Sequence, residues 1–172
     1  MNDRTAGPAD DAPWDSARYL REILRAPVYE ASEHTPLQVM ATLSARVGNT
    51  VEVKREDLQA VHSFKIRGAY NAMRSLTDAQ RARGVVTASA GNHAQGVARS
   101  ASVLGVRATI VMPTVTPSIK IDAVRSLGGE VLLRGENFDA AKAEAQRLSE
   151  VESLTFIAPF DDPRVIAGQG TI

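Results

Sequence analysis

The fold of this chain is decided by residues 85–112, which read VVTASAGNHAQGVARSASVLGVRATIVM. A strand-like segment at 85–88 is followed by a loop of small residues, an Ala-rich segment over 91–104 and an apolar run at 108–112. Short apolar runs on both sides of a segment with helical spacing predict a strand, a helix and a second strand. A unit of this kind places its two strands in parallel in one sheet.

The same alternation continues on both sides of this stretch. Thr77 and Gln80 fit a capping box, and Thr116 before Pro117 fits a helix start with proline in the first turn. Strands that alternate with helices predict an α/β fold with a doubly wound parallel sheet. The other strands are expected at 51–54, 131–133 and 155–157, and the other helices at 64–75, 77–83, 116–127 and 137–151.

The two ends of the chain depart from this pattern. Residues 1–13 are small, polar and rich in Pro and Gly, and we expect a flexible tail there. Residues 14–25 have apolar side chains at helical spacing, which predicts a further helix. Residues 165–172 close the chain without a cap or a polar tail, so we expect a C-terminally truncated part of a longer protein.

The composition excludes several classes of site. The 172 residues are 44% hydrophobic and 23% charged, and 20 basic against 20 acidic side chains favour neither nucleic-acid nor membrane partners. No apolar run approaches the roughly 18 residues of a membrane span, and no secretory signal is present, so a cytoplasmic protein is expected. The absence of cysteine excludes disulfides and thiolate nucleophiles, and with three histidines we expect no metal site. The common nucleotide-binding, hydrolase and zinc-protease motifs are absent from the sequence too.

Lys65 is the first candidate for chemistry. It opens a predicted helix behind Phe64 and the hydroxyl of Ser63, where the helix dipole and burial both disfavour an ammonium group. A lysine amine kept neutral is a nucleophile for an aldehyde. The alternative is a solvated lysine in a first helical turn. The other three lysines, at 54, 120 and 142, have more polar surroundings.

The loop at 89–96, SAGNHAQG, is the second candidate. It follows a strand and opens a helix, which is where open α/β sheets bind ligands, and the first N–H groups of that helix can hold a carboxylate or a phosphate. The alternative is a tight turn with Asn92 as a local cap. His93 alone is expected to be structural more often than catalytic, and the acidic pair at 56–57 is expected to be solvated.

These segments together resemble the fold-type II pyridoxal-phosphate enzymes, the tryptophan synthase β-like family. The resemblance covers about residues 27–172 and is strongest to the biosynthetic threonine dehydratases, also called threonine ammonia-lyases. The matching segments are KRED at 54–57, SFKIRGA at 63–69, SAGNHAQG at 89–96, IVMP at 110–113, KIDAVR at 120–125, GGEV at 128–131, NFD at 137–139, PFDDP at 159–163 and AGQGT at 167–171.

The resemblance implies a reaction and a set of site residues. Pyridoxal 5′-phosphate would bond covalently to Lys65, which would also return as the base for the substrate α-proton. Asn92 matches the contact to the 3′-oxygen of the cofactor, and Phe64 matches the aromatic neighbour of its ring. The residues that match the loop gripping the substrate carboxylate are Ser89, Gly91, Asn92 and His93.

The implied activity is deamination of L-threonine to 2-oxobutanoate and ammonia, the first step of isoleucine biosynthesis. Alternatives are a catabolic serine/threonine dehydratase, which would convert L-serine to pyruvate, and a non-catalytic cofactor-binding remnant. Ala90 argues against the serine racemases, which have Ser at the matching position. The complete enzymes of the family are usually homo-oligomers.

The resemblance also implies a division of the chain. Residues 14–172 would be a truncated catalytic domain, in which 51–157 form the small cofactor-side lobe and 14–50 and 158–172 a fragment of the large lobe. The glycine-rich loop for the cofactor phosphate and the C-terminal regulatory domain would lie beyond residue 172. We therefore expect this chain to show little or no turnover.

Overall fold

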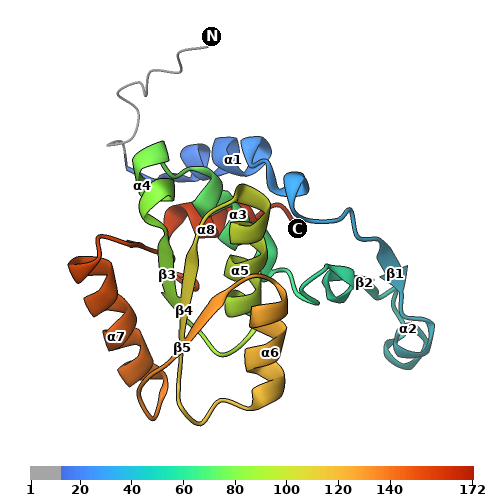
Figure 1. Ribbon diagram of the computed structural model, residues 1–172. Helices are drawn as coiled ribbons and strands as arrows, with labels where there is room; N and C mark the ends of the chain where they lie inside the picture. The colour runs from blue at the N-terminus through green and yellow to red at the C-terminus, as the bar shows by residue number, and fades with distance from the viewer. Residues whose placement is uncertain (1–12) are drawn as a thin grey trace.

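The computed structural model describes residues 13–172, and a four-stranded parallel sheet forms its centre (Figure 1). The sheet order is β5, β4, β3, β6, with parallel pairing throughout. The strands are β3 (Val85–Ala88), β4 (Ala108–Met112), β5 (Glu130–Leu133) and β6 (Thr155–Phe156). The helices that cover it are α3 (Lys65–Arg74), α5 (Asn92–Leu104), α6 (Ser118–Ser126) and α7 (Phe138–Val151).

Helices lie on both faces of this sheet, which confirms the predicted doubly wound α/β fold. Neighbouring strand residues point to opposite faces, so Val85 and Ile110 pack with α3, α5 and α6. Val86 and Val111 pack with α7 on the other face. All four residues of β3 are buried. Because both faces are covered, the strand does not alternate between apolar and polar residues, and Thr87 is its one polar member.

The strand order reverses direction beside β3. From β3 the chain moves outward through β4 to β5, and α7 then carries it back to place β6 on the other side of β3. The carboxyl ends of β3 and β6 therefore flank the point where the winding changes direction. In open α/β sheets, ligands bind in the crevice at such a switch point.

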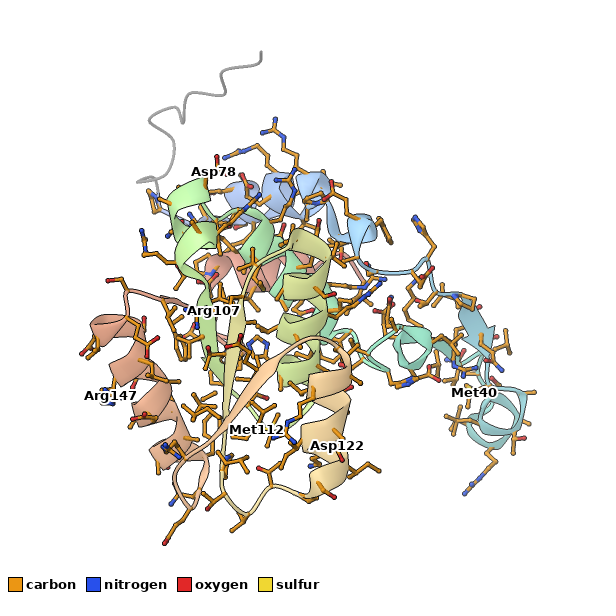
Figure 2. All side chains as sticks on the ribbon, in the orientation of Figure 1. Met40, Asp78, Arg107, Met112, Asp122 and Arg147 are labelled. Atoms are coloured by element: carbon orange, nitrogen blue, oxygen red, sulfur yellow. The ribbon has the colours of Figure 1, made fainter. Side chains whose placement is uncertain are left out.

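A small arm projects from this body (Figure 1). In it β1 (Leu37–Val39) pairs antiparallel with β2 (Glu52–Lys54), and α2 (Ala41–Val47) connects the two. The predicted strand at 51–54 thus exists, but its expected place in the parallel alternation is wrong. Figure 2 shows Met40 on this arm, away from the sheet that holds Met112.

Five short elements complete the described chain: α1 (Ser16–Arg25), η1 (Val28–Glu30), η2 (Glu56–Leu58), α4 (Asp78–Arg83) and α8 (Pro163–Gln169). Of these, α8 packs against α3 and α1. Thr77 and Gln80 form the predicted capping box of α4. The predicted cap at Thr116 is wrong, because Pro117 occupies the cap position and the Thr116 hydroxyl makes no hydrogen bond to any residue of 13–172. The tail predicted at 1–13 lies outside the described residues except for Pro13.

Candidate active site at the strand ends

Lys65 is the first residue of α3 and points toward the carboxyl end of β6. The Ser63 hydroxyl accepts a hydrogen bond of 3.1 Å from the Lys65 backbone N–H. The Lys65 amine, Nζ, donates to the carbonyl oxygen of Pro159 at 2.7 Å. The side chain is half-buried, and its amine lies 5.7 Å from the centre of the Phe64 ring. The lysine is therefore tethered at the switch point of the sheet.

The loop at 89–91 leaves the carboxyl end of β3 and leads directly into α5. The Ser89 hydroxyl accepts from the Gly91 N–H at 3.2 Å, which makes a tight turn. A Cβ atom added to Gly91 would have no atom within 4 Å, so this part of the loop faces open space. The first N–H groups of α5 have no acceptor within the helix and are available to an anion.

Gly96 brings these two predicted segments together. In the crossing of α5 over α3, a Cβ atom at Gly96 would lie 3.1 Å from the Lys65 carbonyl oxygen. This is tighter than nine in ten real Cβ contacts, so the lack of a side chain at Gly96 permits the approach. The start of α5 and the start of α3 consequently lie side by side.

His93 is buried at the centre of this arrangement. Its side chain is 3% exposed, and its Nε2 lies 3.2 Å from the carbonyl oxygen of Ile157. Burial lowers the pKa of His93 to about 4, and the nearby Lys65 charge acts in the same direction, while the bond to Ile157 opposes them. The ring is therefore neutral at pH 7, and because a carbonyl only accepts, its proton lies on Nε2.

The other predicted residues lie at the rim. Phe64 and Asn92 are exposed, while Ser89 and Gly91 are half-buried. A cavity of about 260 Å³ opens on the α7 face of the same strand ends, and both Pro159 and Lys142 line it. The cavity shares Pro159 with the Lys65 tether and so adjoins the site.

An ion pair that the sequence did not reveal supports the start of α3. Glu56 and Arg67 pair through two contacts, of 2.7 and 2.8 Å, with Arg67 fully buried. Burial pushes the pKa of Glu56 up, but hydrogen bonds from Arg67 and Thr35 and the Arg67 charge outweigh it and lower that pKa overall. The prediction of a solvated pair at 56–57 is thus wrong for Glu56, while Asp57 is exposed.

Neither a metal-binding cluster nor a membrane-crossing helix occurs among residues 13–172. No group of three or more His, Asp or Glu side chains within residues 13–172 is placed to hold a metal ion. None of the helices in that range is long and apolar enough to cross a membrane.

The chain is similar in sequence to curated threonine dehydratases. The chain is 62% identical over 165 residues to the L-threonine dehydratase biosynthetic IlvA of Escherichia coli, covering 96% of this chain and 32% of that protein. It is 52% identical over 172 residues to the chloroplastic threonine dehydratase 2 biosynthetic of Solanum lycopersicum, covering 100% of this chain and 28% of that protein. The chain thus spans about a third of the length of the curated relatives it matches.

Solved structures of related enzymes share the fold of this chain. The processed form of threonine deaminase isoform 2 from Solanum lycopersicum superposes with a TM-score of 0.89 at 54% identity, covering 92% of this chain and 47% of that one. Serine racemase from Dictyostelium discoideum gives 0.82 at 36% identity, covering 88% and 50%. The sequence profile described as "Pyridoxal-phosphate dependent enzyme" matches residues 28–172. With most of its length matched in sequence and in fold, this chain belongs to the pyridoxal-phosphate dependent enzyme family.

Proposed function

We propose that this chain carries the lysine-bearing part of a threonine ammonia-lyase, which converts L-threonine to 2-oxobutanoate and ammonia. The observation that supports this most directly is the meeting of two helix starts at one sheet edge. One supplies the Lys65 amine, and the other supplies the N–H groups that follow Gly91. An amine next to N–H groups that can hold a carboxylate suits an amino-acid substrate.

The residues at this edge fit the pyridoxal phosphate on which the family depends. Lys65 is half-buried and held by a single carbonyl, so its amine is within reach of an aldehyde. The open space in front of Gly91 leaves room for the cofactor beside the Lys65 amine. Lys65 would bond to the cofactor, Asn92 would contact its 3′-oxygen, and Phe64 would flank its ring. When bound, the cofactor supplies an electron sink for negative charge at the substrate α-carbon.

The chain's own residues would bind, orient and move one proton. The N–H groups at the start of α5, together with the Ser89 hydroxyl, hold the substrate carboxylate. The Lys65 amine, when free, would take the α-proton onto Nζ. The electron pair of the broken Cα–H bond would then form a Cα–Cβ double bond as the Cβ–O bond breaks, and the β-hydroxyl would take up one proton and leave as water. Burial lowers the pKa of His93 to about 4, so its ring is neutral at pH 7 and is a weak proton acceptor.

The substrate and the assembly belong to the same proposal. Threonine is favoured over serine by the likeness to threonine dehydratases, and L-serine is the second candidate substrate, giving pyruvate. The chain spans 32% of the length of the Escherichia coli relative, and a non-catalytic cofactor-binding module is the second candidate function. Cytoplasmic location and homo-oligomerisation of the complete enzyme are part of the proposal.

Trapping of the cofactor tests the lysine assignment. The chain is incubated with pyridoxal phosphate, and cofactor binding is monitored by visible absorbance. The bound cofactor is then fixed by borohydride reduction, and the labelled residue is identified by peptide mass mapping. We expect a visible band and a label on Lys65, lost in Lys65→Ala and kept in Lys120→Ala, which removes an exposed lysine from the first turn of α6. Label spread evenly over all four lysines would contradict the assignment. Product analysis with threonine and with serine then separates the two substrates.

A further inference from the structure

The segment that follows β6, residues 157–159, is held by three side chains from other elements. The Ile157 carbonyl oxygen accepts from the Thr87 hydroxyl at 2.8 Å and lies 3.2 Å from His93 Nε2. Two residues further on, the Pro159 carbonyl oxygen accepts from the Lys65 amine at 2.7 Å. The carbonyl that holds the lysine therefore belongs to a segment fixed by Thr87 and His93.

The two donors to Ile157 are both deeply buried. Thr87 is fully buried and is the polar residue in the otherwise apolar strand β3. His93 is 3% exposed, and its Nδ1 has no hydrogen-bond partner among residues 13–172. Burial of polar groups is costly unless they make hydrogen bonds, and His93 leaves one nitrogen unsatisfied while it donates to Ile157. Apolar side chains in place of Thr87 and His93 would avoid this cost of burying polar groups.

We propose that Thr87 and His93 are positioning residues for Lys65. By fixing the Ile157 carbonyl they place the Pro159 carbonyl, which holds the lysine amine whenever that amine is not bonded to the cofactor. The inference rests on the proposed role of Lys65 as the cofactor-bonding lysine. In the reaction the amine alternates between a bonded and a free state, and a fixed acceptor defines where the free amine returns.

Competitive acetylation of the whole chain tests this without any turnover. Trace acetic anhydride labels each free amine at a rate set by its lone pair and its accessibility, and peptide mass mapping reports all four lysines at once. An amine held in a hydrogen bond to a carbonyl oxygen is labelled slowly. In Thr87→Val and in His93→Leu we expect Lys65 to be labelled roughly threefold to tenfold faster relative to Lys120 and Lys142, the effect of losing one hydrogen bond.

Conservative variants and a matched control complete the design. Thr87→Ser keeps the hydroxyl and His93→Gln keeps an N–H donor, so both should label Lys65 within about twofold of the parent chain. Ser100→Ala removes another buried hydroxyl, which donates to the Gly96 carbonyl within α5, and should leave the Lys65 rate unchanged. If His93→Leu increases the labelling rate of all four lysines, the substitution has loosened the fold. The result with Thr87→Val then decides whether the proposal holds.

An unchanged Lys65 rate in a folded Thr87→Val would overturn the proposal. The cofactor is tested in a separate arm, by borohydride trapping of pyridoxal phosphate on the same variants. If acetylation changes as expected but no variant or parent chain traps the cofactor, the positioning of the amine stands and the proposed function fails. Slower trapping on Lys65 in Thr87→Val, with normal trapping in Thr87→Ser, supports both.

Discussion

Gly96 of α5 lies against the backbone of Lys65 in α3. A Cβ atom at this glycine would be 3.1 Å from the Lys65 carbonyl oxygen and 3.3 Å from the next backbone nitrogen. Both neighbours are backbone atoms, which cannot move aside as the end of a flexible side chain can. The position of the lysine therefore depends on a residue that has no side chain.

Substitution of this glycine should disturb the lysine. Gly96→Ala forces α3 and α5 apart, and we expect a loss of about 1–3 kcal/mol in the free energy of unfolding together with weaker cofactor trapping on Lys65. Gly91→Ala, five residues earlier in open space, is the control for stability. Urea denaturation of both variants measures the difference. Equal stability of the two would show that the close approach carries no strain.

The buried ion pair should be essential for stability. Glu56→Gln leaves Arg67 charged and buried without its carboxylate, and we expect the free energy of unfolding to fall by about 3 kcal/mol. Asp57→Asn breaks an ion pair with Arg55 that lies at the surface, so it should leave the melting temperature almost unchanged. Thermal unfolding followed by circular dichroism compares the two. Similar melting temperatures would contradict the prediction.

Stability should depend on pH through His93. Between its usual pKa of 6.5 and its folded pKa of about 4, the unfolded chain binds a proton that the folded chain excludes. The free energy of unfolding therefore falls as the pH falls through this window, by up to about 1.4 kcal/mol per pH unit. Urea denaturation at several pH values across this window measures the slope. His93→Gln should flatten it, whereas His34→Gln, at an exposed histidine, should not.

Asn92 should affect cofactor affinity without affecting covalent capture. In Asn92→Ala we expect pyridoxal phosphate to bind roughly twofold to tenfold more weakly, the effect of one neutral hydrogen bond, while Lys65 is still the trapped residue. Titration of the visible absorbance of the bound cofactor gives the affinity. Asn49→Ala, at an exposed asparagine after α2, is the control. A loss of trapping on Lys65 would mean that Asn92 does more than contact the cofactor.

The parallel sheet could be predicted because its signals are local. The runs at Val85–Ala88 and Ala108–Met112 are apolar except for Thr87 and Thr109, since both faces of each strand are covered. Helix starts at Thr77 and Asn137 carry side-chain caps within three residues. Such patterns need no knowledge of distant contacts.

The arm and the support of the site could not be predicted in the same way. The strand residues of β1 and the helix α2 are almost wholly exposed, so burial imposes no periodicity on them. Glu56 is next to the exposed Asp57 in a charged stretch of sequence, which is typical of a solvated loop. Its ion-pair partner Arg67 comes 11 residues later, so the local sequence does not indicate the pairing. The roles of Ile157 and Pro159 are carried by backbone carbonyls, and the residue type says nothing about where these point.

The tether of Lys65 also has a consequence for the order of folding. Lys65 and Pro159 are 94 residues apart in the chain, and Thr87 and Ile157 are 70 apart. Contacts between residues so distant in sequence form slowly, because a long loop must close first. As the chain emerges from the ribosome, α3, β3 and α5 are all made before β6 exists. The resting place of the lysine is therefore completed only when β6 docks beside β3.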